Sequence, residues 1–345
     1  MSVAVFEAYD SNVEFQNQNG AGDLGSSVNV HVGGDWNFPR ADVKLSGDAN
    51  QIFYRQATDL NHFTYGFGSS ASYQISRRLR WSASESISSG YAQDQRVLTD
   101  AGLLFPKVLT RVVTASTQFG YDITRKTHVD VAVSGQSVSF GGPDLVGGSS
   151  LGVHLNVTRQ IGRSQTVGIS TGDTKSNGIT GDIQGLLGTW SATIGRALTL
   201  AATAGVRPYT LPGQSGFLVA PGGSFNVNAH LPRGNTFGLT YERAVEQAYG
   251  FSGTHLAHRF GASYGLAATP RLHFDASANY GLNTYPLDPS FRLDGRTGNV
   301  GVKYAVRQNL AVSADYTAWA RRSASEPPVT TYRVTSSLAY GFSWR

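Results

Sequence analysis

The stretch Thr330–Arg345 reads TTYRVTSSLAYGFSWR. From Tyr332 to Trp344 its even-numbered positions are apolar except for Ser336, and its odd-numbered positions are polar or small. A period of two over this length predicts a strand with one apolar and one polar face. The apolar face ends in Tyr340, Phe342 and Trp344. A soluble sheet can also bury such a face, so the rest of the chain has to decide the architecture.

The same alternation recurs along most of the chain. In Leu272–Asn283, for example, apolar or small residues alternate with polar ones from His273 to Asn283. A helical spacing of i, i+3, i+4 does not explain such segments. Strands of this kind, repeated at similar length, close into a barrel with apolar residues outside and polar residues inside. Other clear examples are residues 28–38, 63–75, 129–134, 151–158 and 299–307.

The connections between these segments fall into two classes that alternate along the chain. Short ones, each with an Arg, lie near residues 39–40, 76–78, 124–126, 162–164, 195–196, 232–234, 269–271 and 307–309. Longer ones lie near 18–25, 55–60, 91–108, 141–148, 173–181, 209–215, 248–252, 284–292 and 322–328. Short turns at one end and long loops at the other are typical of outer-membrane barrels. The sequence therefore predicts an all-β, transmembrane, antiparallel up-and-down barrel of about eighteen strands, with both termini at the short-turn end.

Composition limits the alternatives. Charged residues make up 15% of the 345, below the roughly 25% of ordinary soluble proteins. Cysteine is absent, which excludes disulfides, thiolate catalysis and cysteine-based metal sites. The net charge of +5 is spread along the chain without a basic run, so we expect no nucleic-acid partner. We expect one domain over residues 1–345, with any export signal removed before Met1, because Met1–Val3 has no signal-like pattern.

Catalytic signals are weak. The chain has no nucleophile elbow and no phosphate-binding glycine loop before a helix. His273 and Asp275 share one face of one strand. They could act as a metal or acid/base pair, or they could simply be polar residues of the barrel interior, and we favour the interior role. His255 and His258 lie near a predicted rim, where we expect solvated side chains. We therefore expect no enzyme activity, catalytic residue, cofactor or metal.

The polar parity of the strands supplies candidate pore-lining residues. Their charges have both signs in nearly equal number. They could neutralise one another across the barrel, and they could line a pore for polar solutes. The two roles are compatible, because a barrel of about eighteen strands encloses an aqueous channel. The candidates are Lys44, Asp48, Arg80, Asp130, Arg207, Glu242, Arg259, His273, Asp275, Lys303, Asp315 and Arg333.

Two features of the connections leave alternatives open. The longest loop, Tyr91–Thr110, carries Leu103, Leu104 and Phe105, which are unusual for a free loop. It either enters the lumen as a constriction, which we favour, or extends the wall outside. The arginines of the short turns are either ordinary exposed residues or a basic rim for anionic lipid or cargo.

The N-terminal segment Ala8–Val13, AYDSNV, resembles the opening strand of the β-barrel porins associated with exopolysaccharide gene clusters. The ending at Trp344 also resembles the C-terminal signature of bacterial outer-membrane barrels. The resemblance implies a passive conduit for polysaccharide export in the outer membrane of a Gram-negative bacterium, in contact with membrane lipid and with a periplasmic export partner. A diffusion channel for polar solutes is the competing channel hypothesis. The alternative is a structural or adhesive barrel with a blocked lumen.

Overall fold

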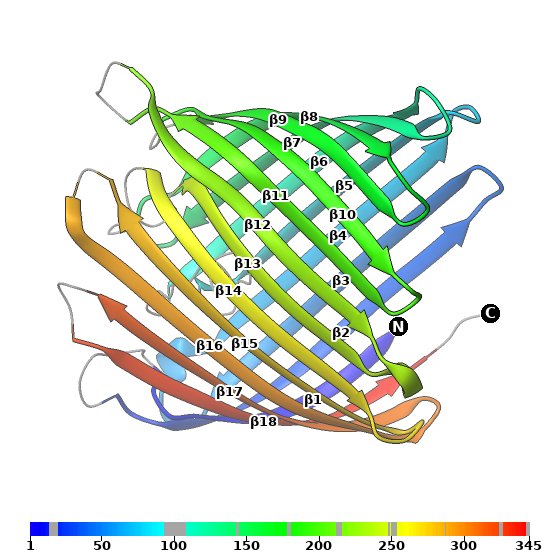
Figure 1. Ribbon diagram of the computed structural model, residues 1–345. Helices are drawn as coiled ribbons and strands as arrows, with labels where there is room; N and C mark the ends of the chain where they lie inside the picture. The colour runs from blue at the N-terminus through cyan, green and yellow to red at the C-terminus, as the bar shows by residue number, and fades with distance from the viewer. Residues whose placement is uncertain are drawn as a thin grey trace.

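A computed structural model describes residues 1–13, 20–92, 108–142, 145–177, 181–211, 216–247, 249, 254–286, 288–323 and 327–342. Its strands form a single 18-stranded antiparallel sheet in which each strand pairs with its neighbours in the chain. The first strand, β1 (Ser2–Asp10), pairs with both β2 (Asp23–Asn37) and β18 (Val329–Gly341), so the sheet closes into a barrel (Figure 1). The predicted fold class is confirmed. No helix among the described residues is long and apolar enough to cross a membrane.

Most of the strands have 12 to 15 residues, as the sequence pattern predicts, and the shortest and the longest have 9 and 20. The first nine are β1 Ser2–Asp10, β2 Asp23–Asn37, β3 Ala41–Tyr54, β4 His62–Gln74, β5 Leu79–Tyr91, β6 Leu109–Asp122, β7 Thr127–Phe140, β8 Gly148–Gln160 and β9 Gln165–Asn177. The second nine are β10 Ile183–Ile194, β11 Leu198–Tyr209, β12 Leu218–His230, β13 Thr236–Gln247, β14 Thr254–Ala267, β15 Leu272–Tyr285, β16 Asp288–Arg307, β17 Leu310–Ser323 and β18 Val329–Gly341. Short 3-10 turns lie at Thr58–Leu60 and Pro232–Gly234.

The two ends of the chain meet where the barrel closes. β1 and β18 run antiparallel from Ser2 opposite Gly341 to Asp10 opposite Arg333. The terminal ammonium of Met1 donates to the carbonyl of Phe342 at 3.1 Å. Met1 and the end of β18 at Gly341 both lie at the short-turn end, as predicted for the two ends of the chain (Figure 1). Residues 343–345, which include the predicted terminal aromatic Trp344, lie outside the described residues.

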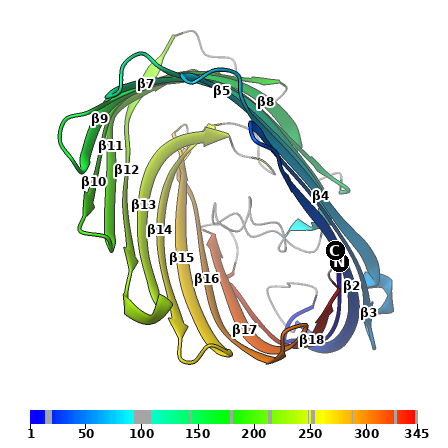
Figure 2. The same cartoon turned by 90° about the vertical axis from the view of Figure 1, so that its right-hand side faces the viewer.

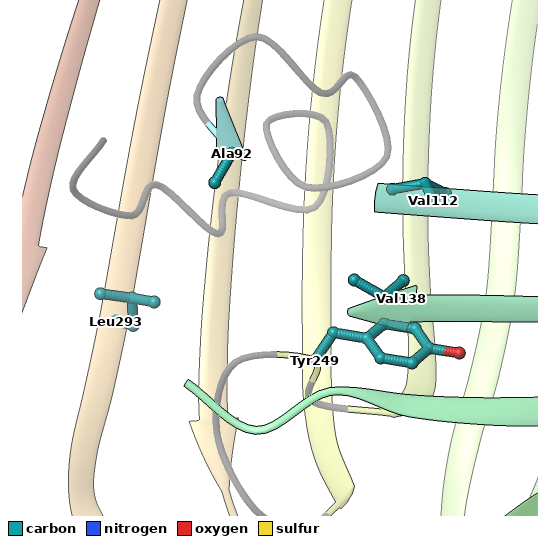
Figure 3. Packing of buried hydrophobic residues seen from close by; sticks show 5 residues of the cluster. All are labelled: Ala92, Val112, Val138, Tyr249 and Leu293. Carbon is teal, nitrogen blue, oxygen red and sulfur yellow. The ribbon is translucent and has the colours of Figure 1, made fainter. Parts of the chain in front are cut away.

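Contacts between distant strands show which face of the sheet points inward. Val112 of β6, Val138 of β7 and Leu293 of β16 belong to one buried cluster, although β16 is not a neighbour of β6 or β7 (Figure 3). Only side chains inside a closed barrel reach across in this way. From these residues, the alternation along each strand and the pairing between strands assign all remaining strand positions to the inward or the outward parity.

The outward parity is apolar and exposed. Phe274 of β15 is 39% exposed and Val300 of β16 is 56% exposed. On β18 the outward residues Tyr332, Val334 and Leu338 are also exposed. An exposed apolar belt around a whole barrel is unusual for a soluble protein and typical of a membrane barrel.

One expected connection is wrong. The sequence predicts a long loop near residues 284–292, but β15 ends at Tyr285 and β16 begins at Asp288. The two strands keep pairing from Leu272 opposite Tyr304 to Thr284 opposite Arg292, and the register shifts before Tyr285 pairs with Asp288. An antiparallel ladder absorbs such an irregularity as a bulge, so the Pro and Asp residues here do not end the strand.

Candidate functional site

The predicted pore-lining residues all lie on the inward parity of the strands. None of them is fully buried, so each side chain is at least partly accessible from the interior. The strands bring some of them together and keep others apart. Their lining of a conducting pore stays a prediction.

A group of four charges spans β11 to β14, and we call Arg207, Glu242, Glu246 and Arg259 the charge cluster. Arg259 lies directly opposite Glu242 in register, with Nη1 and Oε2 3.7 Å apart. Its Nη2 also donates to Oε2 of Glu246. Arg207 lies beside Gly222, where a Cβ atom would sit 2.9 Å from Nε of the arginine, so the absence of a side chain there makes room for it. Two acidic and two basic groups make the charge cluster neutral overall.

Two carboxylates converge over Gly301 of β16. A Cβ atom at this glycine would lie 2.5 Å from Oδ1 of Asp315 and 2.9 Å from Oδ1 of Asp275. His273 instead lies opposite Lys303, so the structure gives no support to a His273–Asp275 metal or acid/base pair. Among the described residues, no group of three or more His, Asp or Glu side chains could hold a metal ion.

Arg333 joins the closing strand to an aromatic ring. Its Nη2 donates to Oδ2 of Asp10 at 3.2 Å, across the β1–β18 seam. Its guanidinium carbon also lies 5.3 Å from the ring centroid of Trp319. Trp319 is not among the residues predicted from the sequence. A signal for it was present, since this tryptophan falls on the polar parity of β17 between Thr317 and Arg321.

The other predicted residues lie apart on the wall from β3 to β7. Arg80 of β5 donates to the Ser72 hydroxyl at 3.1 Å. Asp130 of β7 lies 2.9 Å from Nε2 of His128. Lys44 and Asp48 share the inward parity of β3. These side chains give this part of the wall a polar surface on which the charges are dispersed and do not form one cluster.

The β13–β14 hairpin leaves the wall and enters the barrel. Pairing between β12 and β13 ends at Gly223 opposite Arg243, while β13 and β14 continue to pair as far as Gln247 opposite Thr254. Figure 2 shows the end of β13 curving into the interior, away from the end of β12. Val245 and Leu256 belong to the outward parity, yet they pack in one cluster with Ile183, Tyr209, Leu211 and Ala220 from the wall around β10–β12.

This infolding overturns one expectation about the histidines. His255 is only 3% exposed, so the prediction of a solvated side chain at the rim is wrong. The reason is that the end of the hairpin turns into the barrel, so His255 lies inside it and not at the rim. Periodicity within β13 or β14 carries no signal for this position.

The end of the hairpin reaches side chains of β8 and β9, which are not its neighbours in the ring. The Tyr249 hydroxyl lies 3.3 Å from the Ser150 hydroxyl of β8, and Gln247 donates to the Ser176 hydroxyl of β9. Burial raises the pKa of the Tyr249 phenol, so this hydroxyl stays protonated at neutral pH. The hydroxyl also donates to Oε1 of Gln247 at 2.9 Å.

Tyr249 completes the cross-barrel cluster, which we define as Ala92, Val112, Val138, Tyr249 and Leu293 (Figure 3). This cluster narrows the interior at the long-loop end of the barrel. Ala92, at the start of the long loop, is fully buried in it. Most of the loop predicted as a constriction, residues 93–107, lies outside the described residues, so its role stays a prediction.

No protein-family model matches the chain, and no curated protein sequence matches it. Among solved structures the chain is similar to the outer membrane protein OpdK of Pseudomonas aeruginosa, with a TM-score of 0.50, 12% identity and coverage of 99% of this chain and 98% of that one. A structure of OpdK with vanillate gives a TM-score of 0.51 at 11% identity, with the same coverage. OccK11 (OpdR) of Pseudomonas aeruginosa gives 0.50 at 13% identity, covering 99% of this chain and 96% of that one. At such low identity the likeness shows the fold alone.

Proposed function

We propose that the protein is a passive channel that lets small polar solutes cross the outer membrane of a Gram-negative bacterium. The observation that carries the proposal is the closed ring of 18 strands with an apolar, exposed outer face and a polar, charge-balanced inner face. A barrel of this size is too wide for side chains alone to fill it. The fold it shares with an outer membrane protein supports the same location.

The outer belt agrees with a membrane location. Residues such as Phe274, Val300 and Leu338 lose contact with water only if lipid covers them. A closed barrel also leaves no unpaired strand edge, which the hydrocarbon region of a membrane requires. Lipid is therefore the partner of the outer face.

Small solutes fit the interior better than a polymer. The cross-barrel cluster narrows the path at the long-loop end, and a polymer would need a wide path along the whole axis. The sequence motif behind the polysaccharide-export resemblance is the short segment Ala8–Val13. Export of a polysaccharide, and the periplasmic partner that it would need, stay predictions.

A structural barrel with a blocked lumen is the second candidate, and the cross-barrel cluster is the observation that favours it. Single-channel recording in planar bilayers separates the two. We expect discrete, ohmic steps of ion current from the purified, folded barrel. The channel function would be overturned, and the blocked barrel would remain, if no current were seen from any of three proteins. These are the native protein, Tyr249→Ala and a variant lacking residues 93–107.

A further inference from the structure

The inner wall holds a polar recess of about 510 Å³ on β12 to β15. Four neutral hydrogen-bonding side chains line it, Ser224, Asn226, Thr240 and Asn279, together with the charged pair Glu242 and Arg259. All six belong to the inward parity, so the recess opens to the interior of the barrel. A concave site with a few convergent polar groups is the usual form of a small-molecule site.

The charges beside the recess compensate one another. Arg259 is shared between Glu242 and Glu246, and Arg207 lies close enough to Glu246 to interact with its charge. A guanidinium held by two carboxylates has little capacity left for an anionic ligand. The neutral groups therefore decide what the recess binds.

These neutral groups are suited to hydroxyls. Serine and threonine hydroxyls and asparagine amides each donate and accept hydrogen bonds, as a solute hydroxyl does. Thr240 and Asn279 converge over Gly261, where a Cβ atom would lie 2.5 Å from Oγ1 of Thr240 and 3.0 Å from Oδ1 of Asn279. The glycine keeps the space between these two side chains free.

An aromatic ring lies further along the same register row. Asn279 of β15 pairs with Thr297 of β16, and Thr297 pairs with Trp319 of β17. Trp319 is thus two strand spacings, about 10 Å, from Asn279. Its ring is only partly buried, and Arg333 lies over it while held by Asp10. Val329 also packs against Trp319. The part of the indole that Arg333 and Val329 leave exposed offers an apolar surface on which the C–H face of a sugar ring can pack.

We infer that this wall is a binding site for a neutral, hydroxyl-rich solute, a sugar of two or three rings, with hydroxyls in the recess and one ring against Trp319. The inference rests on the proposed channel function, because the solute reaches the site through the lumen. It names the substrate class of that channel. A charged hydroxyl-rich solute of the same kind gains nothing from its charge, because the cations at the recess are already paired.

The test uses the full-length barrel in planar bilayers with maltotriose and gluconate as probes. We expect maltotriose to interrupt the ion current in a concentration-dependent way, and gluconate to do so less. Asn279→Leu and Trp319→Ala should each weaken the maltotriose block roughly threefold to tenfold, as expected for the loss of one or two favourable contacts. Trp190→Ala, on the outward parity of β10, is the matched control and should leave the block unchanged.

The outcomes separate the site from the channel. Ion current without any maltotriose block would overturn the sugar site and leave the channel function standing, whereas absence of current would overturn both. A stronger block by gluconate would mean an anion site. An undiminished maltotriose block in both Asn279→Leu and Trp319→Ala would also contradict the assignment, since their ion current itself shows that these variants fold.

Discussion

Arg259 of β14 and Glu242 of β13 face each other across one antiparallel pair, with their charged groups 3.7 Å apart. Both side chains are partly exposed to the interior, so we expect the pair to contribute only about 0–1 kcal/mol to folding stability. Its main physical effect is electrostatic, because Arg259 compensates Glu242 and Glu246 at the wall of the channel.

The first prediction concerns ion selectivity. Arg259→Gln leaves Glu242 and Glu246 with Arg207 as the remaining cation of the charge cluster, a net charge of −1. The channel should therefore become more cation-selective, because charged side chains along a pore bias the ions that pass. Glu242→Gln should shift selectivity toward anions. The reversal potential in a KCl gradient measures both effects. A shift of the same sign in both variants would show that these side chains do not face the conducting path.

The second prediction concerns the cross-barrel cluster. Tyr249→Ala removes the ring that packs with Val138 and Leu293, so single-channel conductance should rise. Tyr249→Phe keeps the ring and loses only the hydroxyl contacts to Ser150 and Gln247, so its increase should be smaller. Tyr264→Ala, on the outward parity of β14, is the control and should conduct like the native protein. Equal conductance in all variants would place the narrowest point of the channel elsewhere.

The third prediction concerns the two faces of β15. Ala276 lies opposite Tyr264 and Val300 on the outward parity, whereas Ser277 lies opposite Ser263 and Asn299 on the inward parity. Arg in place of Ala276 should cost about 2–4 kcal/mol of folding stability, because a lipid-facing charge near the midplane must leave water or deform the bilayer.

Ser277→Arg is the matched control for Ala276→Arg. It places the same side chain one residue along, in the wet interior, so it should cost little and move selectivity toward anions. Folding into liposomes measures both costs. Equal costs, or a larger cost at Ser277, would contradict the assignment of faces.

The fourth prediction concerns two glycines of neighbouring strands. A Cβ atom at Gly205 of β11 would overlap the carbonyl oxygen of Leu186, so Gly205→Ala forces the backbone to move. We expect a loss of about 1–3 kcal/mol, the usual range for overpacking. At Gly185 of β10 nothing lies within 4 Å of such an atom, so Gly185→Ala should fold like the native protein. Urea unfolding in detergent micelles measures the difference, and equal stability of the two variants would argue against this local geometry.

Local patterns along the chain are sufficient to predict the architecture of the barrel. The alternation in segments such as Leu272–Asn283 predicts the strands and their faces, and the alternation of short and long connections predicts the closed, even-numbered ring. The inward parity of Lys44, Arg259 and Asp315 follows from the same periodicity. The pattern does not predict which face of the first strand points inward, because its apolar residues fall on both parities. Only the pairing of this strand with β2 and β18 puts Val5 outside and Phe6 inside.

What the sequence by itself determined is therefore the barrel and its two faces, because these depend on a period of two that each strand carries alone. Which inward residues meet was decided by the tertiary structure. Val245 and Leu256 have outward parity. Val245 is buried, with Leu256 partly buried beside it, only because the β12–β13 ladder ends at Gly223 and the hairpin turns under the wall. The contact of Tyr249 with Ser150 joins the β13–β14 hairpin to β8, which is not its neighbour in the ring. Such contacts depend on where pairing stops and on the closure of the whole ring, and no single strand encodes either.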